Sequence, residues 1–275
     1  MNAPTKLQEL MPQTLEFQLD GKTVEAYEGE SILQAAKRAG VDIPHLCYKE
    51  GLRPDGNCRA CVVEIKGERV LAPSCCRAAT AGMEVQACSD RAVKSQKMVV
   101  EMLLSDMPDV GYKWNDANGE EGPCGQHGEL SEWAERLDIE VRPELKALRR
   151  EQPAHDVSHP AMAVNLDACI QCNRCVRACR EEQVNDVIGY AMRGGDSKIV
   201  FDLDDPMGDS TCVACGECVQ ACPTGALMPK TQIGSQAVDR KVDSVCPFCG
   251  VGCLITYNVK DEQIVSVEGR DGPAN

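Results

Sequence analysis

Two runs of four cysteines share one spacing in the second half of the chain. In each run, two residues separate the first three cysteines from one another, and three residues precede the fourth. The runs are Cys169, Cys172, Cys175 and Cys179, and then Cys212, Cys215, Cys218 and Cys222. Three thiolates on one short loop can hold three irons of a cubane iron–sulfur cluster, but such a loop cannot reach the far iron. The spacing therefore predicts two [4Fe–4S] clusters, each completed by a cysteine from outside its own loop.

Over residues 160–230 this pattern resembles that of bacterial two-cluster ferredoxins, in which the last cysteine of each run binds the other cluster. Pro223 follows the second run, whereas Arg180 stands where the first run usually continues with proline. The resemblance implies two ligand sets, which are Cys169, Cys172, Cys175 and Cys222 for one cluster, and Cys212, Cys215, Cys218 and Cys179 for the other. Two zinc sites or a disulfide scaffold are the alternatives, but zinc usually takes pairs of ligands from separate segments.

The composition favours metal binding as the reason for the many cysteines. The chain has 275 residues, 18 of them cysteine, whereas disulfide frameworks occur in short secreted chains. Its N-terminus has neither a signal peptide nor a twin arginine, and no stretch is long and apolar enough to span a membrane. The formal net charge of −14 disfavours nucleic acid as a partner. We therefore expect a cytoplasmic protein without a membrane span, whose thiols bind metal.

The first part of the chain reads as alternating strands around one helix. Apolar residues alternate over 14–19, Asp20-Gly21 is typical of a hairpin turn, and residues 22–27 return. A helix is predicted from an N-cap at Ser31 to Gly40, followed by a ligand loop. A second hairpin, residues 61–66 and 68–72, is predicted about Gly67. This order predicts a β-grasp fold.

Four cysteines of this region are candidate [2Fe–2S] ligands, and they are Cys47, Cys58, Cys61 and Cys75. Ten residues separate the first two, unlike the plant-type spacing, in which four residues separate them. Residues 14–88, with IPHLCY, GNCRAC and APSCC, resemble the N-terminal domain shared by the complex I large iron–sulfur subunit, iron-only hydrogenases and NAD-linked formate dehydrogenases. The resemblance implies one [2Fe–2S] cluster on these cysteines. Cys76 stays open as an alternative to Cys75. Cys88 is expected as a small core residue, and His45 as a packing or hydrogen-bonding residue.

The following region is predicted to be helical. An apolar stripe predicts a helix over residues 90–105, and shorter helices are predicted over 131–137 and 143–150. In the same families one histidine and three cysteines hold a further [4Fe–4S] cluster just after an LLS segment. Here Met107 stands where that histidine is expected, and only Cys124 remains of the three cysteines. We expect a vestigial segment without a cluster.

Two further interpretations concern the same region. A rearranged site built from Cys88, Cys124 and His127 stays open as an alternative to the vestigial segment. Residues 152–160 have the composition of a linker, with His155 and His159 expected to be solvated.

A third cysteine motif lies near the C-terminal end. Cys246, Cys249 and Cys253 are interleaved with glycines, after a polar linker over 229–241 and before two strand-like pieces, 254–259 and 263–268. The CPFCGVGC segment resembles the entry segment of molybdenum or tungsten bis-pterin oxidoreductases, in which a fourth cysteine follows downstream. The resemblance implies a further [4Fe–4S] cluster when that fourth ligand is present. A zinc knuckle is the alternative.

The fold class predicted is α+β, in consecutive domains. They are a tail (1–13), a [2Fe–2S] β-grasp domain (14–89), a helical segment with a degenerate cluster motif (90–160), a two-[4Fe–4S] ferredoxin domain (161–230), and a linker with the start of a cluster and bis-pterin domain (231–275). Such clusters in series relay single electrons. No motif for chemistry on a substrate is present in this stretch.

This order of sites resembles the α subunit of cytosolic NAD-dependent formate dehydrogenases. The resemblance implies oxidation of formate to CO2, reversibly, at a molybdenum or tungsten bis-pterin guanine dinucleotide held by the remainder of the catalytic subunit. Electrons would pass along the clusters to a partner iron–sulfur subunit that binds FMN and NAD. The alternative is an electron-transfer subunit of a NAD-reducing hydrogenase or of a complex I-like NADH dehydrogenase, although these families keep the histidine-ligated cluster that Met107 argues against.

Overall fold

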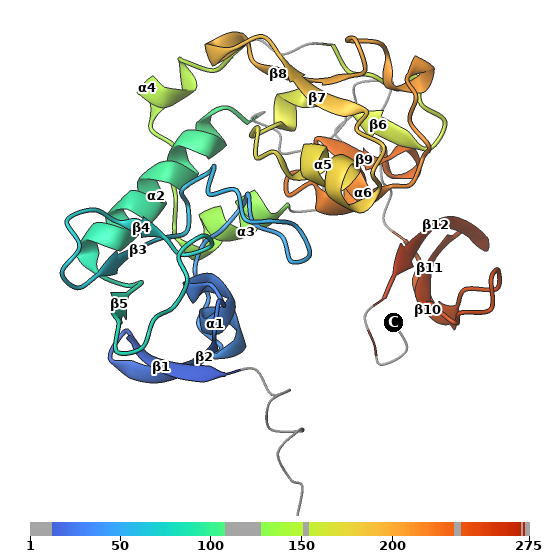
Figure 1. Ribbon diagram of the computed structural model, residues 1–275. Helices are drawn as coiled ribbons and strands as arrows, with labels where there is room; N and C mark the ends of the chain where they lie inside the picture. The colour runs from blue at the N-terminus through green and yellow to red at the C-terminus, as the bar shows by residue number, and fades with distance from the viewer. Residues whose placement is uncertain (1–12, 108–127, 151–153, 234–237, 271, 273–275) are drawn as a thin grey trace, which may run out of the picture.

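The computed structural model describes residues 13–107, 128–150, 154–233, 238–270 and 272. Helices and strands are mixed, and the sheets are small (Figure 1). Among these residues, no helix is both long and apolar enough to cross a lipid bilayer.

A five-stranded sheet forms the N-terminal domain. Its strands are β1 (Thr14–Leu19), β2 (Lys22–Tyr27), β3 (Val62–Ile65), β4 (Ala72–Pro73) and β5 (Glu84–Gln86), in the order β2-β1-β5-β3-β4. β5 runs parallel to β1, and the other neighbours are antiparallel. Helix α1 (Ile32–Arg38) buries one face against this sheet, in a core that includes Phe17, Leu19, Val63 and Val85.

Local sequence signals explain the first hairpin and helix. Asp20 and Gly21 both have positive φ, 48° and 77°, as the tight turn between β1 and β2 requires. The Ser31 hydroxyl accepts from the amide of Gln34, whose side chain in turn accepts from the amide of Ser31, so a capping box begins α1. Gly40, at φ 74°, ends the helical turn. These predictions are confirmed.

The second hairpin is shorter than predicted. β3 pairs with β4 only through Val62 with Pro73 and Val63 with Ala72, and residues 68–71 form no strand. This segment contains Glu68 and Arg69, and Val70 is 59% exposed. It therefore offers little apolar surface, apart from the partly buried Leu71, to hold it against the sheet.

Three helices follow the sheet. They are α2 (Asp90–Ser105), α3 (Glu129–Arg136) and α4 (Pro143–Lys146). α2 has the bounds predicted and begins at an N-cap, Ser89, whereas α4 is shorter than predicted. An apolar cluster joins α2 and α3 to both neighbouring domains through Leu46, Ala60, Val100, Met107, Leu130, Ala134, Ala168 and Ala226.

Two small antiparallel sheets frame the next domain, which holds both cysteine runs. β6 (Met162–Val164) pairs with β9 (Leu227–Pro229), and β7 (Ile188–Ala191) pairs with β8 (Lys198–Phe201). Its helices are α5 (Arg174–Arg177), which continues into the π-helical turn η3 (Ala178–Glu182), and α6 (Glu217–Ala221). Single 3-10 turns are η2 (Leu166–Ala168), η4 (Gly194–Asp196), η5 (Met207–Asp209) and η6 (Lys230–Gln232).

The segment expected as a solvated linker packs onto this domain instead. Asp156 pairs with Val164 through two backbone hydrogen bonds, and its carboxylate accepts from the amide of Met207 at 2.7 Å. The prediction of a solvated His159 is wrong, because its side chain is buried and its Nδ1 accepts from the amides of Ala161 and Met162. Burial lowers the pKa of His159. His155 lies at the surface, 3.8 Å from a carboxylate oxygen of Asp167.

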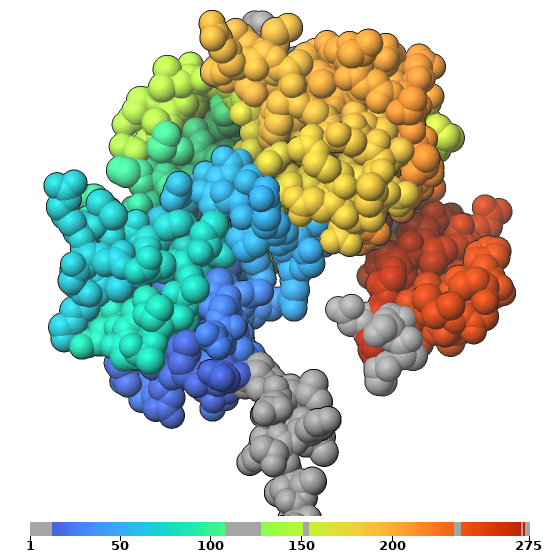
Figure 2. Space-filling view, viewed as in Figure 1, coloured from blue at the N-terminus to red at the C-terminus, as the bar shows by residue number. Residues whose placement is uncertain are grey.

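The C-terminal part is an antiparallel sheet of β10 (Arg240–Val245), β11 (Leu254–Lys260) and β12 (Gln263–Gly269) in that order. It forms a separate lobe beside the domain of β6 to β9, which holds both cysteine runs and is called the two-run domain below (Figure 2). The two predicted strand-like pieces lie in β11 and β12. The linker predicted over 229–241 includes the first two residues of β10, and no strand is predicted over 242–245. The side chains of β10 are mostly exposed, so it carries little apolar signal.

Candidate metal centres

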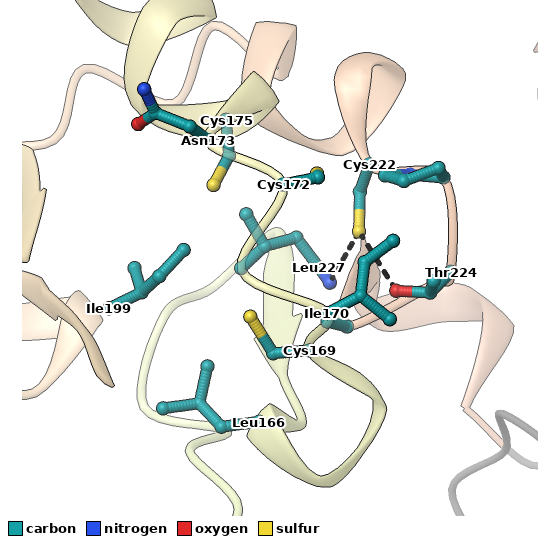
Figure 3. A pocket seen from close by; sticks show the side chains of 12 residues that line it. Leu166, Cys169, Ile170, Cys172, Asn173, Cys175, Ile199, Cys222, Thr224 and Leu227 are labelled. Carbon is teal, nitrogen blue, oxygen red and sulfur yellow. Dashed lines mark hydrogen bonds between the residues drawn. The ribbon is translucent and has the colours of Figure 1, made fainter. Parts of the chain in front are cut away.

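The first of two cysteine-lined cavities in the two-run domain contains cysteines from both runs. Cys169, Cys172 and Cys175 line it from one loop, and Cys222 reaches it from the end of α6 (Figure 3). The remaining lining is largely apolar and includes Leu166, Ile170, Ile199, Ala226 and Leu227. These are the four cysteines that the ferredoxin resemblance assigned to one cluster.

Hydrogen-bond donors face the sulfurs of this cavity. The amide of Gln171 donates to Cys169 Sγ at 3.4 Å, and that of Leu227 donates to Cys222 Sγ at 3.5 Å. Burial raises the pKa of Cys169 to about 11 and raises the pKa of Cys175 well above its ordinary value. A cluster would need these thiols deprotonated, so its binding would release protons. Four thiols with amides aimed at their sulfurs in an apolar shell fit a [4Fe–4S] cluster.

The second cavity repeats the arrangement with the partners exchanged. Cys212, Cys215 and Cys218 line it from one loop, and Cys179 comes from η3 of the first run. Val187 N donates to Cys179 Sγ at 3.4 Å. Cys215 is exposed, so this cavity lies closer to solvent than the first at that corner.

The two cysteine loops have the same backbone conformation. Gln171 and Ala214, each two residues after the first cysteine, have φ of 54° and 57°. Asn173 and Gly216, four residues after it, have φ of 68° and 82°. In each loop, the amide two residues on donates to the first cysteine's sulfur at 3.4 Å. The left-handed residues therefore turn the amides inward, toward the sulfurs.

The structure brings the four N-terminal candidates together. Cys47 N lies 3.4 Å from Cys58 Sγ, and the Cys47 thiol accepts hydrogen bonds from those of Cys58 and Cys75, which together hold the pKa of Cys47 far below its usual value. Cys75 also donates to Cys61, and lowers the pKa of Cys61 to about 7. Cys75 is fully buried, whereas Cys76 is exposed, with its Sγ 3.6 Å from that of Cys75. The geometry favours Cys75 over Cys76 in a four-thiol site.

Two neighbouring predictions have different outcomes. His45 packs edge-on against Tyr48 and Trp133, and its Nδ1 lies 2.8 Å from Ile43 O, which confirms a packing and hydrogen-bonding role. The prediction that Cys88 is a core residue is wrong, because Cys88 is exposed. The chain leaves β5 there, and the Asp20 carboxylate accepts from the Cys88 amide at 3.2 Å.

The degenerate segment contributes apolar packing where its residues are described. Met107 is buried with Val100 and Leu130, so an apolar side chain fills the position at which the related families have histidine. Cys124 and His127 lie outside the described residues, and the rearranged site remains a hypothesis.

The third motif forms the turn between β10 and β11. Cys246 N donates to Cys253 O at 2.8 Å, and Gly250 and Gly252 have φ of 80° and 87°. Cys246 is partly buried, whereas Cys249 and Cys253 are exposed. This stretch of chain therefore presents three thiols on one surface turn.

Sequence reasoning missed two buried arginines between the domains. Arg174 and Arg177 lie on α5 inside the first cysteine run and are 2% and 3% exposed. Both donate to backbone carbonyls of the N-terminal ligand loop. No local pattern separates such arginines from solvated ones, because the partner atoms lie about 130 positions earlier in the chain.

Three domain families match the chain. Residues 12–90 match the 2Fe-2S iron-sulfur cluster binding domain, residues 168–226 the 4Fe-4S dicluster domain, and residues 239–275 the molybdopterin oxidoreductase Fe4S4 domain. The chain is an iron–sulfur electron-transfer module. Its three cluster-binding domains coincide with the three groups of cysteines described above.

The chain is similar to parts of several oxidoreductases. It is 36% identical over 223 residues to the NADP-reducing hydrogenase subunit HndD of Solidesulfovibrio fructosivorans, covering 78% of this chain and 36% of the relative. It is 31% identical over 252 residues to an NADH-quinone oxidoreductase subunit of Rhizobium meliloti, covering 90% and 28%. It is 26% identical over 307 aligned positions to the putative formate dehydrogenase SH0748 of Staphylococcus haemolyticus, covering 96% and 30%.

The module therefore spans about a third of the length of these relatives. A chain in the crystal structure of a NAD+-reducing [NiFe]-hydrogenase in its H2-reduced state has a similar fold. The TM-score is 0.67 at 24% identity, over 82% of this chain and 92% of that one.

Proposed function

We propose that this module belongs to a cytoplasmic NAD-dependent formate dehydrogenase. A molybdenum or tungsten bis-pterin cofactor would be held by the remainder of the catalytic subunit, and FMN and NAD by a partner iron–sulfur subunit. The observation that carries the proposal is one chain combining a dicluster domain at 168–226 with a molybdopterin oxidoreductase Fe4S4 domain at 239–275. The putative formate dehydrogenase relative aligns with 96% of the chain, including both domains.

The proposed ligands follow the cavities. A [2Fe–2S] cluster would be held on a β-grasp domain (14–89) by Cys47, Cys58, Cys61 and Cys75. The support for this fold is the sheet in the order β2-β1-β5-β3-β4, with α1 packed against it. The domain at 161–230 would hold two [4Fe–4S] clusters on the exchanged sets, supported by the shared cavity linings. Cys246, Cys249 and Cys253 would hold another in the domain at 231–275, once a fourth ligand is present.

Bound clusters would supply single-electron transfer. The protein's own part is to hold and shield them. Apolar residues such as Ile199 and Leu227 keep water from the first cavity, and the amides of Gln171 and Leu227 stabilise negative charge on its sulfurs. The first run supplies Cys179 to the second cavity, and the second run supplies Cys222 to the first cavity. Neither site can therefore form unless the two cysteine runs are packed together.

One alternative function has specific support. The relative with 36% identity is a hydrogenase subunit, so an electron-transfer role in a NAD(P)-reducing hydrogenase is a second candidate. The two candidates differ in the metal at the catalytic site. A formate dehydrogenase of this kind would have molybdenum or tungsten there, and a hydrogenase would have nickel or iron alone.

Metal analysis of the native complex distinguishes them. We would purify the chain anaerobically with its partners, count Fe, Mo, W, Ni and Zn by mass spectrometry, and assay formate-dependent NAD reduction. Molybdenum or tungsten together with that activity supports the proposal. Nickel, or iron with neither molybdenum nor tungsten, refutes the formate assignment. Zinc in place of iron refutes the electron-transfer role. The isolated chain should bind about ten irons, or about fourteen if the last site fills.

A further inference from the structure

Arg177 is a buried cation that links the two-run domain to the N-terminal ligand loop. Its Nη2 donates to Cys47 O at 2.5 Å, its Nη1 donates to Arg53 O, and its Nε lies 3.4 Å from Asn173 O. The side chain is almost fully buried. The loop that carries the first candidate [2Fe–2S] ligand is therefore held by a guanidinium from another domain.

The neighbouring arginine has an anionic partner, whereas Arg177 has none among the residues that the structure describes. Arg174 makes a bidentate ion pair with Glu129 at 2.7 and 2.8 Å, and also donates to Leu46 O at 3.1 Å. Within the described ranges, no carboxylate lies at ion-pair distance from Arg177. A buried charge is costly unless an opposite charge is near, and carbonyl dipoles compensate for it only in part.

The anion missing from this arrangement is supplied by the site that Arg177 contacts. Four thiolates and their cluster carry net negative charge, and one of them belongs to Cys47, whose carbonyl the guanidinium holds. We propose that Arg177 is the charge partner of the N-terminal [2Fe–2S] site, and that it raises the reduction potential of the cluster bound there. This inference rests on the ligand set under Proposed function. Arg177 is not a ligand of that site; its charge acts on the cluster from its position beside the Cys47 carbonyl.

The sign of the effect follows from charge. One-electron reduction of the cluster, with the electron taken from an external donor such as dithionite, adds one negative charge beside a fixed cation. In a buried environment of low dielectric constant the cation stabilises the reduced form more than the oxidised form. Removing the positive charge should therefore make reduction harder and move the midpoint potential to more negative values.

Other contacts keep the guanidinium in place. Asn57 Nδ2 donates to Gln171 O at 2.9 Å, and Asn173 Nδ2 donates to Asp55 Oδ2 at 3.0 Å. Lys49 Nζ donates to Gln220 O at 2.8 Å. These bonds attach the ligand loop to the two-run domain on several sides. Arg177 therefore remains buried at the loop. The effect of its charge on the [2Fe–2S] site depends on the docking of the two domains.

The test is a redox titration of the full-length chain followed by electron paramagnetic resonance. Arg177→Gln, which keeps a hydrogen-bond donor but loses the charge, should shift the [2Fe–2S] reduction equilibrium by on the order of tenfold, about 59 mV more negative for a one-electron couple. Arg177→Lys should restore most of the potential. Arg180→Gln is the matched control, because Arg180 is three residues further on, exposed and paired with Asp186, and it should leave the midpoint unchanged.

A second variant tests the sign independently if Arg177→Gln does not accumulate. Glu129→Gln removes the anion that compensates Arg174, so it should move the midpoint in the positive direction. An unchanged midpoint in Arg177→Gln, an equal decrease in Arg177→Lys, or a decrease in Glu129→Gln would each overturn the inference. A wild-type chain without a [2Fe–2S] signal would instead refute the proposed ligand set, so the two failures are distinguishable.

Discussion

The thiol of Cys222 lies in the same cavity as that of Cys169, although the two residues belong to different cysteine runs. The reciprocal exchange places Cys179 with the second run. The two candidate cubane sites are therefore not two independent loops. Each depends on the packing of α5 against α6, so damage to one run should be felt at both sites.

Cys222→Ala should remove a ligand from the first cubane site and spare the N-terminal site. We expect the chain to lose about four irons, or up to about eight if the second cubane site is disturbed as well, with the [2Fe–2S] signal retained because Cys47 and its partners lie in another domain. Iron analysis and electron paramagnetic resonance measure the two quantities. Cys88→Ala is the comparison, because Cys88 is exposed and lies outside the [2Fe–2S] set and both exchanged [4Fe–4S] sets; iron loss in that variant would instead support the rearranged site with Cys124 and His127. Equal loss of both signals would contradict separate sites.

The adjacent pair Cys75 and Cys76 provides a matched comparison. Cys75→Ser should abolish or strongly change the [2Fe–2S] signal, because the Cys75 thiol is buried in contact with those of Cys47 and Cys61. Cys76→Ser should leave the signal intact, because that thiol faces solvent. Visible circular dichroism of the purified variants measures the outcome. The reverse pattern would make Cys76 the ligand.

A side chain at Gly56 is expected to disturb the ligand loop. Gly56 has a φ of 61°, and a Cβ atom added there would lie 2.9 Å from Cys76 Sγ, so the exposed Cys76 side chain would have to turn aside. Gly56→Ala should therefore lower [2Fe–2S] occupancy in part, through backbone strain and the displaced Cys76 side chain. Gly67→Ala separates this clash from backbone strain, since Gly67 also has positive φ, 88°, but its Cβ would meet nothing within 4 Å. If both variants lose the cluster equally, strain alone explains the loss.

His159 should make the two-run domain less stable in mild acid. Burial lowers its pKa below the value in the unfolded chain, so its contribution is complete above the unfolded value of about 6.5 and is lost as the pH falls through the folded value. Its Nδ1 accepts two amide hydrogen bonds, which protonation would remove.

Thermal unfolding at pH 7.5 and pH 5.5 measures this effect. Between these two pH values, the melting temperature of the wild type should fall further than that of His159→Asn. The side-chain oxygen of the asparagine can accept in place of Nδ1 without titrating. His155→Asn is the control, because His155 is at the surface. A drop that is the same in wild type and His159→Asn would assign the acid sensitivity to other groups.

Local sequence signals were sufficient for the secondary structure that they specify. The Asp20-Gly21 turn and the Ser31 cap predict β1, β2 and α1, because turn and cap geometry depend on neighbouring residues only. The apolar stripe of α2 likewise gives its bounds. No strand is predicted over most of β10, and the return strand predicted over 68–72 overlaps β4 only at Ala72. Exposed or very short strands are set by their partners in the sheet and not by periodicity.

Cysteine types and spacings alone indicated iron–sulfur chemistry, because a cluster needs several thiolates on tight loops. Only the tertiary structure could show that Cys75, and not Cys76, is buried with the other thiols, that His159 is buried and Cys88 exposed, and that Arg177 reaches Cys47 O. Burial and charge pairing depend on segments far apart in the chain. The kind of metal chemistry could therefore be predicted from short stretches of sequence. The burial and charge around each site depend on the packing of one domain on another.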